Sequence, residues 1–144
     1  FRERRLRPQM DLARAGGRLP ATRERLLDRL LERLDRWIDH RPEPPSLIHG
    51  DLWGGNWLTN TNGRPALIDP AVYYGHREAE LAMCRLFGGF PDTFFAAYDE
   101  AWPPLPGRDE RLPLLQLYHL LNHLNLFGEG YGGQVDGVLR RYVG

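Results

Sequence analysis

A short apolar run that leads into a glycine-rich loop constrains this chain more than any other stretch. Leu47 and Ile48 are followed by His49-Gly50-Asp51-Leu52-Trp53-Gly54-Gly55-Asn56, so a histidine, an aspartate and an asparagine stand among glycines. Glycine permits the tight backbone course of such a loop, because it has no Cβ to clash at positive φ. We therefore expect a short buried strand over 46–48 that delivers these polar side chains into one loop.

Two further short strands are expected directly after this loop, over 57–59 and 65–68. They are separated by Asn62-Gly63, a dipeptide typical of β-hairpin turns because both residues tolerate positive φ. Asn56 comes just before the first strand, and Asp69 just after the second. The open end of one hairpin would therefore direct Asn56 and Asp69 toward the same point in space, as two ligands of one metal ion require.

Apolar residues recur at three- and four-residue steps elsewhere, which predicts that the rest of the chain is mostly helical. The clearest helix runs from Thr22, which can cap its start, to about His40, and Pro42 helps to end it. A loop is expected from Asp69 to Arg77. Further helices are expected within 1–19, at 78–87, 92–102 and 109–127, and around 135–142. The predicted fold class is α+β, mainly α, in a single domain over 1–144.

Composition argues against several function classes. The 19 basic and 19 acidic residues balance, which gives no support to a nucleic-acid or membrane-surface partner. No apolar run approaches the ~20 residues of a membrane span, and no signal-peptide pattern is present. The lone cysteine, Cys84, excludes an internal disulfide and is expected to be a buried thiol in a reducing, cytoplasmic setting.

The spacing of His49, Asp51, Leu52 and Asn56 is that of the protein-kinase catalytic loop, H-R-D-L-x-x-x-N, which a metal-binding aspartate follows downstream. In phosphoryl transfer, one aspartate takes or orients the proton of the acceptor hydroxyl, while an asparagine and a second aspartate hold Mg²⁺. Asp51 would be the catalytic base, and Asn56 and Asp69 the metal ligands. His49 would bond nearby backbone, and Gly50 would complete the loop scaffold.

Two other interpretations of the same residues are open. Aspartate and asparagine in turns often only bond local backbone, so the pattern could be structural. A metal hydrolase using His49, Asp51, Asp69 and His76 fits less well, because its ligands are usually richer in histidine and acidic pairs.

A kinase also needs a glycine-rich turn over the ATP phosphates and a lysine that pairs with them. Nothing before Leu47 reads as a nucleotide-binding sheet, and every basic residue of this chain is arginine. We expect either that an N-terminal nucleotide-binding lobe lies upstream of this chain or that the protein is not an active kinase.

Motifs from about Phe1 to Tyr131 resemble the fructosamine kinase (ketosamine-3-kinase) family. The wider aminoglycoside-phosphotransferase-like group shares H-G-D and Asn56 but lacks Trp53 and the Tyr-Gly-His-Arg-Glu stretch. The matching stretches are HGDLWGGN (49–56), IDPA (68–71), YYGHREAELAM (73–83), LFGGF (86–90), AY (97–98), PG (106–107), LYHLLNH (117–123) and NLFG (125–128).

This resemblance implies a protein-kinase-like fold of which the chain is the C-terminal lobe, and the chain alone is then expected to be inactive. It implies ATP- and Mg²⁺-dependent phosphorylation of the sugar 3-hydroxyl of fructosamines or ribulosamines, either small or protein-bound, leading to deglycation. It also implies that Asp51 is the base, that Asn56 and Asp69 hold Mg²⁺, and that Trp53 is a sugar-facing platform. A core position for Trp53 is the alternative.

Five further residues are candidates for substrate binding. His76, Arg77 and Glu78 could shape the acceptor site, or they could form a helix start braced by ion pairs. His119 and His123 lie on successive turns of an expected helix, where they could contact the acceptor or belong to a buried polar network.

Two positions depart from the family pattern. Gly54 replaces a common serine and is expected to loosen the loop, whereas Glu80 replaces a common aspartate and could alter a supporting contact. Two other functions also stay open: a kinase of another amine-bearing acceptor, such as an aminoglycoside or choline, and a truncated, non-catalytic kinase-like binding module.

Overall fold

The computed structural model describes residues 1–38 and 43–144, which form two compact units. Unit 1 comprises Phe1–His40 and Gln116–Gly144, and unit 2 comprises Arg41–Leu115. The expected end of the long helix near His40 and Pro42 lies outside the described residues.

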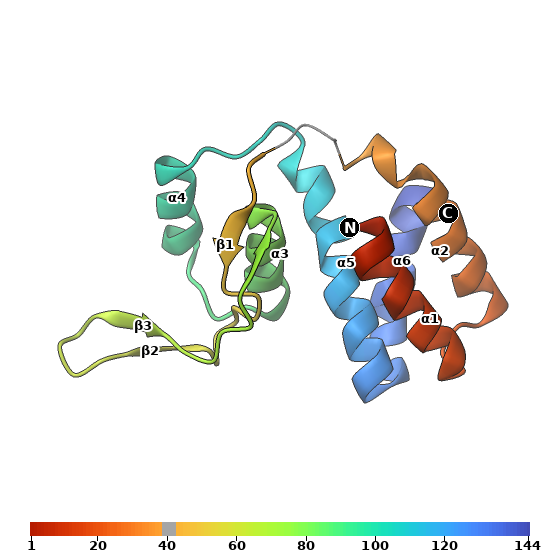
Figure 1. The fold of residues 1–144 in the computed structure, drawn as a ribbon, viewed down its shortest axis with the longest axis horizontal. Helices are drawn as coiled ribbons and strands as arrows, with labels where there is room; N and C mark the ends of the chain where they lie inside the picture. Colours follow the sequence, from red (N-terminus) through yellow and green to blue (C-terminus); the bar gives the residue numbers. More distant parts are fainter. Residues whose placement is uncertain (39–42) are drawn as a thin grey trace. The chain divides into compact units, whose positions relative to one another are not determined.

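Unit 1 is helical, and Figure 1 shows α1, α2, α5 and α6 packed side by side. Its interior is formed by leucines and valines that face one another from these helices, as the three- and four-residue apolar spacing predicted. The fully buried members include Leu6, Leu27, Leu30, Leu117, Leu121, Leu124, Val135 and Leu139. Its elements are the π-helical turn η1 (Arg2–Leu6), α1 (Arg7–Ala15), α2 (Ala21–Arg33), the 3₁₀ turns η2 (Leu34–Arg36) and η3 (Glu129–Tyr131), α6 (Gly132–Val143) and most of α5 (Arg108–Phe127).

The start and end of α2 differ from the prediction. Pro20 occupies the N-cap position and no side chain caps the helix, so the capping role expected of Thr22 is wrong. The regular helix ends at Arg33 and tightens into η2. Near the start of α2 the buried Arg23 bonds both Glu129 and Asp136, which ties the helix to the C-terminal elements of unit 1.

In its described residues, 43–115, unit 2 has two small antiparallel sheets and two complete helices. The strand β1 (Ser46–Ile48) pairs with β4 (Tyr73–Gly75), and β2 (Trp57–Thr59) pairs with β3 (Pro65–Leu67). The helices are α3 (Arg77–Phe87) and α4 (Asp92–Ala101), and the first turns of α5 also belong to this unit. The mainly helical α+β class is therefore confirmed.

The strand β4 was predicted to be loop. It forms because Tyr73 pairs with Ile48 and Gly75 pairs with Ser46. This pairing joins segments that are distant in the sequence, so the pattern of the three β4 residues alone does not predict it. The hairpin turn also differs in detail. Only Gly63 takes a positive φ, of 73°, while the Oδ1 atom of Asn60 accepts from the backbone N–H groups of Asn62 and Arg64.

The core of unit 2 forms where α3 and α4 meet the loop after β1. Leu52, Leu81, Cys84 and Phe95 are buried together, and Phe90, Phe94 and Tyr98 pack against them. Cys84 is a buried free thiol, as predicted, and burial raises its pKa to about 12. None of the helices in the described part of the chain is long and apolar enough to span a membrane.

Candidate active site

The loop that follows β1 is held by close backbone packing at Gly50. This residue has φ 82°, and a Cβ built on it would overlap the carbonyl oxygen of Ala71. The N–H of Ala71 donates to the carbonyl of His49 at 2.8 Å. The segment after β3 therefore lies directly against the loop, and only glycine fits between them.

The His49 imidazole links the same two segments. Its Nδ1 accepts the backbone N–H of Asp51 at 3.3 Å, and its Nε2 lies 2.9 Å from the carbonyl oxygen of Ile68. Since Nδ1 is the acceptor, the proton belongs on Nε2, which donates to that carbonyl. His49 thereby bonds backbone on both sides, between Asp51 and the residue that precedes Asp69.

Asn56 is turned toward Asp51 by two hydrogen bonds. Its Nδ2 donates to the backbone carbonyl of Asp51 at 2.8 Å and to the carboxylate Oδ2 of Asp51 at 2.9 Å. The Asn56 side chain is only 7% exposed, and both of its amide hydrogens are used in this way. Its Oδ1 is consequently the atom left to accept a hydrogen bond or to coordinate a cation.

Asp69 directly follows Ile68, the residue that lies opposite Asn56 at the open end of the hairpin. The N–H of Ile68 donates to the carbonyl of Asn56 at 3.0 Å, extending the β2–β3 ladder by one step. Asp69 then takes φ 51°, the one left-handed non-glycine residue in the described part of the chain. That conformation costs about 1–2 kcal/mol for an ordinary residue, and such strain clusters at functional sites.

The oxygen donors at this open end fit a hard cation. Mg²⁺ is typically held by one or two protein side chains and completes its shell with water and substrate phosphate oxygens. Asn56 Oδ1 and the exposed Asp69 carboxylate are donors of this kind. Among residues 1–38 and 43–144 no three His, Cys, Asp or Glu side chains cluster in a way that could hold a metal ion.

The helix α3 supports the loop through Glu80. Its Oε2 accepts the backbone N–H of Gly50 at 3.0 Å. The contact fixes the residue between His49 and Asp51, so Glu80 makes a supporting contact to the loop.

The turn after α3 holds the other end of the loop. Gly54 donates its N–H to the carbonyl of Gly88 at 3.0 Å, and the indole Nε1 of Trp57 donates to the carbonyl of Gly89 at 3.2 Å. A Cβ at Gly54 would lie 2.9 Å from the Cα of Gly89. Gly54 was expected to loosen the loop, but the structure differs: its glycine allows two backbones to pack closely and bond.

Trp53 does not occupy the core. Its side chain is 43% exposed, and its ring lies over Gly55, where any Cβ would overlap the ring atoms. The alternative of a core tryptophan is therefore wrong, because the ring is largely open to solvent within the loop that carries Asp51 and Asn56. The sugar-facing role stays a prediction.

His76, Arg77 and Glu78 form the braced start of α3. The Nδ1 of His76 accepts the backbone N–H of Glu78 at 3.1 Å, which caps the helix. Arg77 is 2% exposed, and its guanidinium donates to Glu43 at 2.6 Å and to the carbonyl of Pro103 at 2.8 Å.

Glu78 is fully buried, and Arg111 donates to both of its carboxylate oxygens at 2.9 Å. The contacts of Arg77 and Glu78 are those of the bracing alternative. Arg111 was missed from the sequence because 33 residues separate it from Glu78 and no local pattern pairs them.

His119 and His123 lie in unit 1, whereas the loop residues lie in unit 2. His119 is 8% exposed, and burial lowers its pKa to about 4, with smaller contributions from His123 and Arg5. The Nδ1 of His123 lies 2.9 Å from the carbonyl of His119, and its ring packs on Phe127 and Tyr131. The burial of His119 suits the polar-network alternative, and acceptor contact by either histidine stays a prediction.

The chain was compared with known proteins and solved structures. The fructosamine kinase family model matches residues 1–144. A protein named as a ketoamine kinase from Lactiplantibacillus plantarum is 48% identical over 99% of this chain and 51% of its own length. The mouse ketosamine-3-kinase is 50% identical over 67% of this chain and 31% of its own length.

A crystal structure described as a fructosamine-3-kinase from Thermobifida fusca superimposes with a TM-score of 0.86 and 42% identity, over 96% of this chain and 48% of that one. The chain thus spans about half the length of the first relative and of this structure. With the family model matched from end to end, the chain belongs to the fructosamine kinase family.

Proposed function

We propose that this chain is the catalytic C-terminal lobe of a ketosamine kinase, which phosphorylates the 3-hydroxyl of fructosamines or ribulosamines on small amines or proteins. The observation that carries the proposal is the arrangement at the open end of the hairpin. There Asp51 holds the amide nitrogen of Asn56, so that Asn56 Oδ1 and the exposed Asp69 carboxylate are left as oxygen donors.

Asp51 is the proposed base in this reaction. Its Oδ2 is engaged by Asn56, so Oδ1 is the atom that accepts the proton of the acceptor hydroxyl. The hydroxyl oxygen forms the new bond to the γ-phosphorus of ATP, the bond from that phosphorus to the bridging oxygen breaks, and ADP leaves. Asn56 and Asp69 would hold Mg²⁺, which neutralises the phosphate charge when bound.

The nucleotide would be bound mainly by the part of the protein outside this chain. The relatives are about twice as long, and a kinase needs a cation on the ATP phosphates that no lysine here can supply. We therefore propose an N-terminal nucleotide-binding lobe as the partner of this one. Without it, this chain is expected to transfer no phosphate.

The acceptor would lie against the open face of Trp53, because the flat faces of a sugar pack well on an exposed aromatic ring. His76 is half-buried at the start of α3 and has an imidazole that could contact the acceptor, and His123 is a second candidate. For Arg77 and Glu78 the buried ion pairs support a bracing role instead. The relative's name, ketosamine-3-kinase, supports the sugar 3-hydroxyl as the reacting group.

The experiment uses the longest natural form of the protein, with ATP, Mg²⁺ and a fructosyl-amine. Phosphate transfer that disappears on Asp51→Asn is the expected result. Transfer to an aminoglycoside or choline in place of the fructosyl-amine would overturn the acceptor class and leave the kinase fold in place. A protein that binds no nucleotide would favour the non-catalytic binding module.

A further inference from the structure

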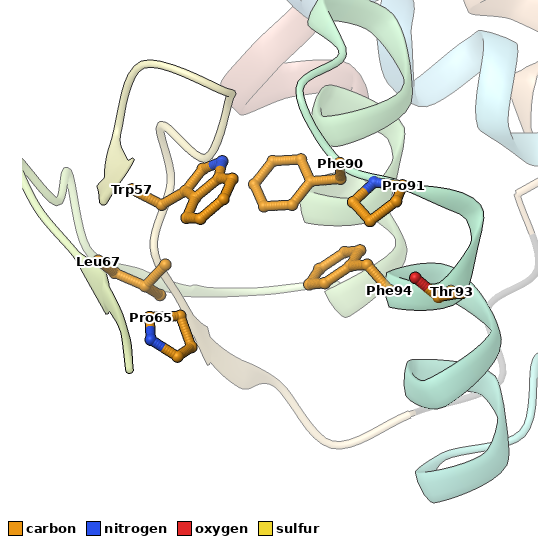
Figure 2. Close-up of a pocket in the computed structure, with 7 residues that line it drawn as sticks. All are labelled: Trp57, Pro65, Leu67, Phe90, Pro91, Thr93 and Phe94. Atoms are coloured by element: carbon orange, nitrogen blue, oxygen red, sulfur yellow. The ribbon is translucent and has the colours of Figure 1, made fainter. Parts of the chain in front are cut away.

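An apolar pocket of about 450 Å³ opens between the hairpin and the segment that leads into α4 (Figure 2). Trp57 and Leu67 form one wall, and Phe90 and Phe94 form the facing wall. All of its residues belong to unit 2, and the candidate active-site residues are not among them. The lining residues are Trp57, Pro65, Leu67, Phe90, Pro91, Thr93 and Phe94.

The chemistry of the lining selects an uncharged, apolar occupant. The ring centroids of Phe90 and Phe94 are 4.6 Å apart, and those of Trp57 and Phe90 are 6.2 Å apart. The indole N–H of Trp57 is already bonded to Gly89, and no ionisable side chain lines the pocket. A charged or strongly hydrated ligand would lose its water here without a partner to replace it.

The pocket lies on the other face of the hairpin from Asn56. Successive side chains of a strand point to opposite faces, so Trp57 and its neighbour Asn56 diverge. Trp57 and Leu67 are directly paired across the two strands and face the pocket together. The occupant would therefore not be the phosphate donor or the acceptor held at Asp51 and Asn56.

The hairpin itself lacks the partners that normally stabilise one. In the described part of the chain, β2 pairs only with β3. A two-stranded hairpin is marginal in water unless more strands or a packed face support it. Figure 1 shows it projecting from the rest of unit 2, and Leu58 and Leu67 are large, exposed apolar side chains on its strands.

The length of the relatives indicates what covers this face. The Lactiplantibacillus plantarum protein matches over 51% of its length, so about as many residues again lie outside the matched part. We propose that this pocket is where the part of the longer protein outside this chain docks a large apolar side chain. The inference rests on the proposed function only in taking the chain as one lobe of a two-lobed kinase.

Docking here would also bear on the candidate active site. Phe90 directly follows the Gly88–Gly89 turn, which binds Gly54 and the Trp57 indole. A side chain seated between Trp57 and Phe94 would hold the two walls, and with them both ends of the loop segment that carries Asn56. By binding in this pocket, the second lobe would therefore fix the position of the loop segment that carries Asn56.

The test places the photo-crosslinking residue p-benzoylphenylalanine at Thr93, an exposed threonine of the pocket, in the longest natural form. The matched control places it at Thr22, an exposed threonine on α2 of unit 1. We expect position 93, and not position 22, to crosslink within one molecule to a peptide outside residues 1–144. Crosslinks between two molecules, crosslinks confined to residues 1–144, or no crosslink would each overturn the proposal.

A second measurement uses Thr93→Cys and Thr22→Cys in the same natural form. The engineered thiol at 93 should react with a maleimide about tenfold or more slowly than that at 22. The docked part of the protein must first move away from the pocket before the reagent can reach this thiol. Equal rates would overturn the docking. Phosphate transfer by the wild type is measured in parallel: an active enzyme with an open pocket overturns only the docking, and an inactive protein with a covered pocket overturns only the proposed function.

Discussion

The amide nitrogen of Asn56 donates to both the carbonyl and the carboxylate of Asp51, at 2.8 and 2.9 Å. The pair fixes which end of the Asn56 amide points away from Asp51, and it places a proposed metal ligand in contact with the proposed base. Replacement of either residue should therefore disturb both roles.

Asn56→Asp should lower phosphate transfer by the full natural form about 10²–10³-fold, as loss of one preorganised electrostatic contact does. The new carboxylate would face that of Asp51, and two like charges in contact disfavour each other's ionisation. The measurement is kcat against Mg²⁺ concentration. Asn62→Asp in the exposed hairpin turn is the control and should behave as wild type; wild-type kinetics for Asn56→Asp would refute the assignment.

Gly50→Ala should destabilise the protein by about 3 kcal/mol or more, because the added methyl overlaps the Ala71 carbonyl in a left-handed backbone. Gly63→Ala is the matched control, since Gly63 has φ 73° but open space around its Cα. It should cost only about 1–2 kcal/mol. Urea unfolding measures both, and equal losses would show that the close packing at Gly50 is unimportant.

Glu80→Gln should keep most of the activity, because the amide oxygen can still accept the Gly50 N–H. Glu80→Ala leaves that N–H without its acceptor and should lower kcat by about tenfold or more through misplacement of Asp51. Activity assays on the full natural form separate the two variants. Similar losses in both would indicate that the negative charge of Glu80, rather than its hydrogen bond, is what the loop needs.

Arg111→Met should cost about 3–5 kcal/mol of stability, because it leaves the Glu78 carboxylate buried without its partner. The double variant Glu78→Gln with Arg111→Met should recover part of that loss, since no unpaired charge is left inside. The exposed pair Glu3–Arg7 serves as the control and should contribute about 0–1 kcal/mol. A double-mutant cycle in urea measures the coupling, and additive losses would contradict the structural role.

The free energy of unfolding should fall as the pH is lowered, because His119 is protonated more readily in the unfolded chain. Its pKa is lowered to about 4 in the folded protein, so the unfolded chain binds the proton more readily between that value and about 6.5. The contribution is fully present above pH 6.5 and is lost as the pH falls toward 4, with a total on the order of 3 kcal/mol. His119→Asn should flatten the dependence of unfolding free energy on pH in this window, and an unchanged slope would exclude His119 as its source.

The elements that short-range patterns determine could be predicted from the sequence. The helix expected over 78–87 forms as Arg77–Phe87, and the hairpin strands lie where Asn62-Gly63 separates two apolar runs. The spacing also placed Asn56 just before the hairpin and Asp69 just after it, and the structure has Asn56 directly before β2 and Asp69 directly after Ile68, whose N–H donates to Asn56. The roles of Asp51, Asn56 and Asp69 stay a prediction. Helical periodicity, hairpin turns and glycine stops act over a few residues, so they can be recognised without the fold.

Only the tertiary structure decided which side chains hold these pieces in place. The strand β4, the Glu80–Gly50 bond, the Gly54–Gly89 packing and the Glu78–Arg111 ion pair all join segments about 25 to 35 residues apart. Arg77 and Glu78 illustrate the limit, since the same two residues were compatible with a binding site or a braced helix start. Their burial and ion pairs suit the braced helix start, and burial is a property of the packed chain rather than of its local sequence.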